Sequence, residues 1–175
     1  VLQVPMVISV WDDDYGISVP ARHQTTKENI SEILKGFQRD DKGKGYEIIT
    51  VRGWDYPGLI KAFEKASRIA REEHVPVLLH VREMTQPQGH STSGSHERYK
   101  NEQRLKWEAD FDCLVKMREW ILENAIATQE ELDAINSEAK KHVREQKAEA
   151  WKEFISPIKE EIIHAIALVK ALAAE

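Results

Sequence analysis

Cysteine is almost absent from this chain of 175 residues, in which Cys113 is the only one. One cysteine forms no disulfide within the chain and does not complete a cysteine metal site. Cys113 falls on the apolar face of an expected helix, and free cysteine is among the most buried residue types. We therefore expect it in the core.

Long apolar runs and an excess of basic residues are missing too. No run approaches the roughly 18 residues that span a bilayer, and the start lacks the basic region and cleavage site of a signal peptide. The net charge is −5, and no basic patch with interleaved aromatic residues occurs. These absences argue against nucleic acid or a membrane as partner. They favour a cytoplasmic (bacterial) or mitochondrial-matrix-like location.

What is present predicts an α/β fold. Short β-branched runs predict strands at residues 6–11, 47–51 and 77–81, and runs this apolar are typical of a parallel sheet covered on both faces. A capping box at residues 25–28 predicts a helix of about three turns. Asp55, followed by Pro57, predicts the start of a second crossover helix.

The second half of the chain is expected to be a loop and then helices. Residues 86–100 show no apolar period, and loops this long are usually functional or disordered. One helix is expected through residues 107–121 and another from the capping box at 128–131, with Pro157 separating a final amphipathic helix. We therefore divide the chain into an α/β module, residues 1–100, and a helical extension, residues 101–175, that packs on the module or on a partner subunit.

Two polar segments fall at the ligand-binding edge of this sheet. Residues 12–14 are Asp-Asp-Asp after the first strand, and residues 89–93 are Gly-His-Ser-Thr-Ser after the third; ligands bind at the carboxyl ends of parallel strands. Three adjacent carboxylates repel one another unless solvent or a cation such as magnesium screens them. A solvated acidic turn and a surface histidine at His90 are the alternatives from composition alone.

Together the two segments resemble the alpha subunit of the thiamine diphosphate-dependent 2-oxo acid dehydrogenases. Residues 12–20, Asp-Asp-Asp-Tyr-Gly-Ile-Ser-Val-Pro, stand where the family has a segment close to Asn-Asn-Gly-Tyr-Ala-Ile-Ser-Thr-Pro. Residues 89–93 match its Gly-His-Ser-Thr-Ser loop, and Tyr99-Lys100 match the Tyr-Arg that ends it. The resemblance implies a truncated three-layer parallel sheet of the thiamine diphosphate-binding type, followed by a helical C-terminal extension.

The resemblance also implies a site and partners. By position, Asp13 provides a side-chain ligand and Tyr15 a carbonyl ligand to magnesium, and Tyr15, Ile17, His90 and Ser91 contact thiamine diphosphate. His90 is implied as the catalytic residue that helps the decarboxylated intermediate react with a lipoyl group, and Ser91 matches a position that some relatives phosphorylate. The implied partners are a beta subunit or fused beta segment and a lipoyl-bearing acyltransferase, in a homo- or hetero-oligomer.

Upstream of the match, the family has a Gly-Asp-Gly element about 25 or more residues before the asparagine pair, whereas 11 residues precede Asp12 here. The first residue is Val1, and we expect the sequence to be a segment of a larger protein. The segment alone is then expected to be inactive and to bind thiamine diphosphate poorly.

Thr92, in the Gly-His-Ser-Thr-Ser loop, favours the branched-chain (2-oxoisovalerate) type over the pyruvate type. A non-catalytic assembly module derived from the family is the alternative, and two features favour it: aspartates in place of the asparagine pair, and Gln86 in place of an arginine. Lys100 also stands in place of a family arginine and lacks its bidentate geometry. A third hypothesis, a transketolase-like synthase, is disfavoured by the same loop.

Overall fold

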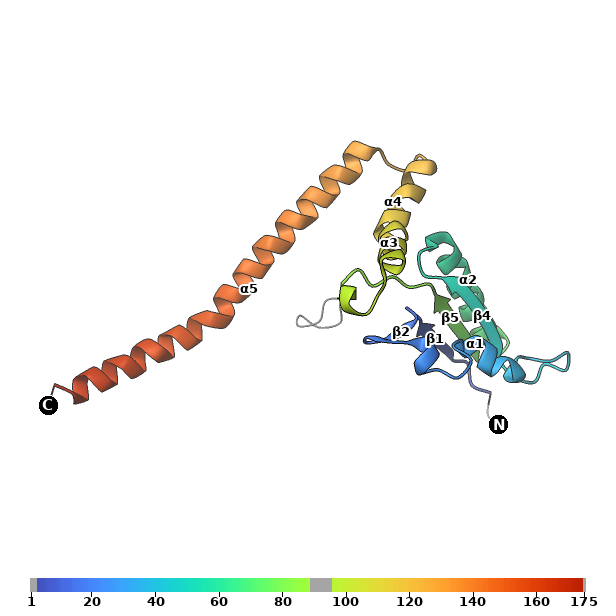
Figure 1. The fold of residues 1–175 in the computed structure, drawn as a ribbon, viewed down its shortest axis with the longest axis horizontal. Coiled ribbons are helices and arrows are strands. Elements are labelled where there is room, and N and C mark those ends of the chain that lie inside the picture. Colours follow the sequence, from blue (N-terminus) through green and yellow to red (C-terminus); the bar gives the residue numbers. More distant parts are fainter. Residues whose placement is uncertain (1–2, 89–95, 175) are drawn as a thin grey trace. The chain divides into compact units, whose positions relative to one another are not determined.

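The computed structural model describes residues 3–88 and 96–174. Within it the chain divides into two compact units, Val1–Glu123 and Asn124–Glu175. The first contains the sheet and the short helices, and the second consists mainly of one long helix (Figure 1). The predicted division at residue 100, between an α/β module and a helical extension, stays a prediction.

The first unit is built on a parallel sheet of three strands in the order β1-β5-β4. The strands are β1 (Val7–Trp11), β4 (Glu47–Arg52) and β5 (Val77–Arg82), each within one residue of its predicted position. Leu79 of β5 stands beside Ser9 on one side and Ile49 on the other. The carboxyl ends of all three strands therefore meet at one edge, and the predicted parallel α/β fold is confirmed.

One face of the central strand β5 packs against α2 (Tyr56–Glu72) (Figure 1). Val77, Leu79 and Val81 alternate along β5 and are at most 1% exposed. They meet the small and apolar side of the helix, formed by Ala62, Ala66, Ile69 and Ala70. Because successive side chains of a strand point to opposite faces, Leu78 and His80 face away from α2.

The start of α2 confirms its prediction. Asp55 is the N-cap, and its Oδ1 accepts a hydrogen bond from Gly58 N–H at 3.0 Å. Pro57 occupies the first turn, where a missing N–H removes no helical hydrogen bond. The structure therefore places the carboxyl end of β4 immediately before a well-capped helix.

The helix predicted from the capping box at residues 25–28 begins later. Lys27 and Glu28 have φ angles of 59° and 60°, which a right-handed helix does not accommodate. Asn29 is the N-cap instead, and its side chain accepts from Glu32 N–H at 3.2 Å. The result is a single turn, α1 (Ile30–Ile33), that continues as the 3₁₀ helix η2 (Leu34–Phe37).

A small hairpin that we did not predict follows β1. It pairs β2 (Tyr15–Gly16) with β3 (Val19–Pro20) and continues into the 3₁₀ helix η1 (Ala21–His23). Ile17 at its turn has a φ of 61°. Strands of two residues are too short to leave a periodic pattern in the sequence.

After the predicted loop come η3 (His96–Arg98), α3 (Glu102–Asp110) and α4 (Cys113–Glu123). The single helix predicted through residues 107–121 is thus two helices. Phe111 ends α3, and Oδ1 of Asp112 accepts from Leu114 N–H at 2.8 Å, which favours a new helix start. The break also changes the face on which Cys113 lies: it is exposed, so its expected core position is wrong.

The second unit is dominated by α5 (Gln129–Leu172). Its start confirms the capping box, because Thr128 and Glu131 each bond the other's backbone N–H. The predicted interruption at Pro157 is wrong, since the helix passes through it. Proline removes one helical hydrogen bond, and a 44-residue helix with regular turns on both sides tolerates that loss. None of the helices in residues 3–88 and 96–174 combines the length and the apolar composition that a membrane span requires.

Candidate functional site

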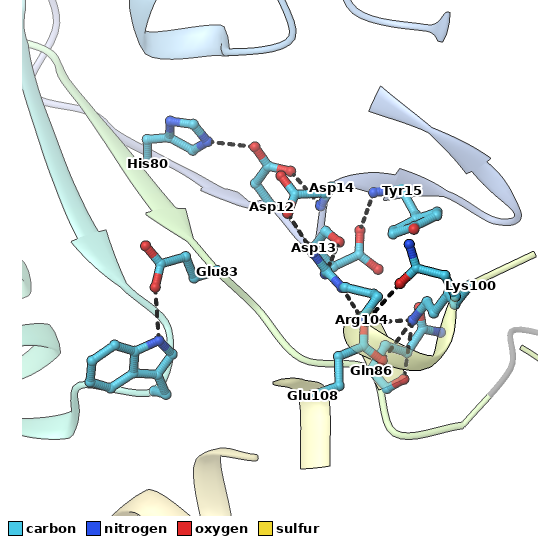
Figure 2. A network of polar contacts seen from close by, with 12 residues as sticks. Asp12, Asp13, Asp14, Tyr15, His80, Glu83, Gln86, Lys100, Arg104 and Glu108 are labelled. Atoms are coloured by element: carbon cyan, nitrogen blue, oxygen red, sulfur yellow. Dashed lines mark hydrogen bonds and ion pairs between the residues drawn. The ribbon is translucent and has the colours of Figure 1, made fainter. Parts of the chain in front are cut away.

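Residues 12–14, which we call the acidic turn, lie at the carboxyl end of β1 (Figure 2). The backbone of Asp12 is tied to the neighbouring central strand: its N–H donates to Val81 O at 2.8 Å, and its carbonyl accepts from Met84 N–H at 3.0 Å. The turn therefore starts from a fixed point at the edge of the sheet.

Both carboxylate oxygens of Asp12 have hydrogen-bond partners within the fold. Oδ1 accepts from the backbone N–H of Asp14 at 2.9 Å, and Oδ2 is 2.9 Å from Nε2 of the buried His80. Asp13 differs. Its Oδ1 accepts from Tyr15 N–H at 3.1 Å, while Oδ2 has no hydrogen bond within the described part of the chain.

Asp14 is paired with a cation from α3. Its Oδ2 accepts from Nη1 of Arg104 at 2.8 Å, and Nη2 of the same arginine donates to the carbonyl of Asp13 at 2.7 Å. Burial alone would lower the pKa of the Arg104 guanidinium, but hydrogen bonds to Glu108 and Asp14 outweigh it and raise the pKa above its ordinary value. Arg104 is thus a permanent positive charge beside the acidic turn.

Behind Arg104 lies a buried ion pair. Nζ of Lys100 donates to both carboxylate oxygens of Glu108, at 2.7 and 2.9 Å, and Nε of Arg104 donates to Oε1 at 2.8 Å. The side chains of Lys100 and Glu108 are 1% and 3% exposed. Lys100 therefore satisfies a carboxylate of its own chain.

Tyr15 lies over these cations. The centre of its ring is 5.1 Å from Nζ of Lys100 and 5.3 Å from the guanidinium carbon of Arg104, and the ring of Tyr99 is 5.9 Å away. A cation within about 6 Å of a ring is attracted to its face. Position 15 of the hairpin is consequently anchored to the segment that follows the predicted loop.

A polar cavity of about 430 Å³ lies next to the acidic turn. Its volume falls within the range of small-ligand sites. Its lining has a surplus of basic side chains over Asp14 and Glu28, which favours anionic groups. The basic residues are Arg22, Lys27, Arg82 and Arg104.

The predicted site residues have different positions in the structure. Asp13 and Tyr15 lie together at the edge of the sheet, and Tyr15 lines the cavity. Ile17 is at the exposed tip of the hairpin, 62% accessible, and does not line that cavity. His90 and Ser91 lie outside the described residues.

The sequence analysis did not identify two residues of this site, His80 and Arg104. His80 is surrounded in sequence by apolar strand residues, and its only signal was one polar side chain in an otherwise apolar run. Arg104 belongs to a helix rich in charges, none of which stands out. Their partners are 68 and 90 residues away, and local pattern does not reveal such pairs.

The donor chemistry of the turn fits a hard cation in part. Asp13 offers a carboxylate oxygen. Tyr15 offers a carbonyl that receives no ladder hydrogen bond, because the bond between Ala21 N–H and the Asp14 carbonyl makes Tyr15 and Pro20 a non-hydrogen-bonded pair of the hairpin. Magnesium prefers oxygen ligands and is bound through one or two carboxylates, waters and substrate phosphates. Among the described residues, no group of three or more His, Cys, Asp or Glu side chains is arranged to bind a metal.

The chain is similar in sequence to subunits of two known dehydrogenases. The pyruvate dehydrogenase E1 component subunit alpha of Rickettsia conorii is 26% identical over 147 residues, 81% of this chain and 41% of that protein. The mitochondrial 2-oxoisovalerate dehydrogenase subunit alpha 1 of Arabidopsis thaliana is 26% identical over 155 residues, 86% of this chain and 31% of that protein. The chain thus spans less than half the length of these relatives. A family model described as dehydrogenase E1 component matches residues 1–159, and the chain therefore belongs to the dehydrogenase E1 component family.

Proposed function

We propose that this chain forms part of the decarboxylating component of a 2-oxo acid dehydrogenase complex. The reaction is the thiamine diphosphate-dependent oxidative decarboxylation of a 2-oxo acid, with transfer of the acyl group to a lipoyl group. One observation carries the proposal within this family: Asp13 and Tyr15 offer oxygen ligands beside a cavity lined by basic residues. The activity belongs to the assembly with a beta subunit or fused beta segment and requires a lipoyl-bearing acyltransferase.

In this proposal Asp13 Oδ2 and the Tyr15 carbonyl bind magnesium, and the basic residues of the cavity neutralise the diphosphate of the cofactor. The pairing of charges in the acidic turn supports the assignment of Asp13 as the carboxylate that binds magnesium. The carboxylates of Asp12 and Asp14 are already bonded to His80 and Arg104, so Asp13 is the member of the acidic turn whose charge remains available. Thiamine diphosphate, when bound, supplies a thiazolium ring that accepts electrons as carbon dioxide leaves.

The roles of His90 and Ser91 rest on the resemblance of the Gly-His-Ser-Thr-Ser segment. His90 is proposed to share or transfer protons during acyl transfer to lipoyl, since histidine exchanges protons near neutral pH. A phosphate on Ser91 would add bulk and negative charge beside the cofactor.

The substrate class is proposed from Thr92, which favours a branched-chain 2-oxo acid. The relatives include both a pyruvate and a 2-oxoisovalerate dehydrogenase subunit at the same 26% identity. Activity on 2-oxoisovalerate at least about tenfold higher in kcat/KM than on pyruvate, a difference of 1.4 kcal/mol, would support the branched-chain assignment. Equal or reversed preference would overturn it.

The decisive experiment measures both carbon dioxide release and acyl transfer to a lipoyl group by the complete assembly, with both substrates. The His90→Ala variant is expected to lose about 100-fold or more in acyl transfer, the usual contribution of a proton-transferring side chain. His142→Ala, a change at an exposed position of α5, is the matched control and should retain activity. An assembly that forms normally but decarboxylates neither substrate, with or without His90, would favour the alternative of a non-catalytic assembly module.

A further inference from the structure

His80 is an unusual member of the central strand. It is fully buried in the middle of the apolar run of β5, and both of its ring nitrogens have partners. Nδ1 is 2.6 Å from Oγ of Ser31 on α1, and Nε2 is 2.9 Å from Oδ2 of Asp12 in the acidic turn. A buried polar group is costly unless it is hydrogen-bonded, so the two partners account for the presence of an imidazole here.

The chemistry of the partners sets the direction of both hydrogen bonds. An ionised carboxylate only accepts, so Nε2 of His80 is the nitrogen that donates to Asp12. In the neutral ring Nδ1 then has a lone pair, and the hydroxyl of Ser31 donates to it. Asp12 thus selects the tautomer, and the bond to Ser31 holds the ring in its orientation toward the turn.

The three residue types also occur in hydrolase triads, but the arrangement differs. In such triads the carboxylate bonds Nδ1 and the serine hydroxyl bonds Nε2, whereas here the two are exchanged. Ser31 is 7% exposed and His80 is fully buried, so a substrate does not reach the hydroxyl. The chain of hydrogen bonds is therefore suited to positioning and not to nucleophilic attack.

We propose that His80 is a positioning residue that, through Asp12, fixes the acidic turn so that Asp13 presents its free oxygen to a divalent cation. The inference rests on the proposed function for the identity of that cation. Asp12 uses Oδ1 to fix the N–H of Asp14 and Oδ2 to bond His80, so losing His80 releases one of the two ties of this carboxylate. The orientation of the next residue, Asp13, then becomes variable.

Two amide variants distinguish a His80 that positions the acidic turn from a His80 that only fills space in the core. His80→Gln places an amide N–H near the position of Nε2 and retains the bond to Asp12, while His80→Asn places its amide near Nδ1 and retains only the bond to Ser31. Both are polar and both alter the packing. If His80 only fills space, the two variants should be impaired alike; if it positions the turn, glutamine should rescue and asparagine should not.

The first readout is hydrogen exchange of backbone amides in the full chain. In His80→Asn, the amides of Asp14 and Tyr15, which bond Asp12 and Asp13, are expected to exchange about tenfold faster or more, and the amide of Leu79 to stay protected. In His80→Gln all three should remain near wild type. If His80→Asn unfolds the sheet, Asp12→Ala removes the same bond from the half-buried end. The readout is then the amide of Tyr15, which Asp12 does not bond and which should exchange faster in the same way.

The second readout is the affinity of the complete assembly for Mn²⁺ in the presence of thiamine diphosphate, measured by electron paramagnetic resonance. His80→Asn should weaken binding about 10- to 100-fold, as is usual when a residue behind a metal ligand is lost, and His80→Gln much less. Equal effects of the two variants, or unchanged exchange at Asp14 and Tyr15, would overturn the inference. A wild-type assembly that binds no Mn²⁺ would instead contradict the proposed function, while the exchange experiment would still decide the role of His80 in the turn.

Discussion

Arg104 and Asp14 are 90 residues apart in the chain, yet Nη1 of the arginine donates to Oδ2 of the aspartate at 2.8 Å (Figure 2). The same side chain donates to Glu108 and to the carbonyl of Asp13. Arg104 therefore links α3 directly to the acidic turn, and it neutralises one of three adjacent carboxylates. This link offsets part of the negative charge of the acidic turn.

Replacing Arg104 with methionine should destabilise the first unit by about 1–3 kcal/mol, because Asp14 and the Asp13 carbonyl lose a donor while Glu108 retains Lys100. Urea denaturation of the full chain, followed by tryptophan fluorescence, measures the change. The control is Arg71→Met, an exposed arginine on α2, which should shift stability by no more than about 0.5 kcal/mol. Equal effects of the two substitutions would show that the Arg104 contacts contribute little.

Glu108→Gln should be more damaging than any change to its partners. It removes the only carboxylate bonded to both Lys100 and Arg104 in the described structure, and an unpaired buried charge costs about 3–5 kcal/mol. Lys100→Met should cost less, since Glu108 keeps Arg104. The same denaturation assay ranks the variants, with the exposed Glu64→Gln as control. A larger loss for Lys100→Met would contradict this account of the cluster.

Pro157 lies inside α5, where proline is about 3 kcal/mol less favourable than alanine. Pro157→Ala should therefore raise the thermal stability of the helix, observed by circular dichroism at 222 nm. Pro57→Ala provides the contrast, because Pro57 is in the first turn of α2 and substitution there should bring no gain. No stabilisation at Pro157 would indicate that the helix is interrupted there in solution, as its sequence suggests.

The sequence predicts those features of the fold that depend on local pattern. The strands, the Asp55 cap and the capping box at Thr128 are governed by alternation or by hydrogen bonds within four residues, and all are found. The errors occur where two local signals compete. Thr25 and Asn29 are both good caps, and the positive φ of Lys27 and Glu28 favours the later one.

Other errors arise from treating one residue as decisive. Pro157 was expected to end a helix, but one missing hydrogen bond is small against a helix of 44 residues. Cys113 was expected in the core because residues 107–121 share one apolar period, and the cap at Asp112 divides that segment. The contacts of His80 and Arg104 join residues distant in sequence, and only the fold brings them together.

We propose above that Asp13 is the carboxylate of the acidic turn that binds the divalent cation beside thiamine diphosphate. The most direct measurement is Mn²⁺ affinity of the complete assembly, with thiamine diphosphate present, for wild type, Asp13→Ala and the exposed control Asp41→Ala. Loss of a direct oxygen ligand should weaken binding by more than about 100-fold in Asp13→Ala, beyond the effect of losing a supporting residue, and leave Asp41→Ala unchanged. Wild-type affinity in Asp13→Ala would show that Asp13 is not a ligand of the cation.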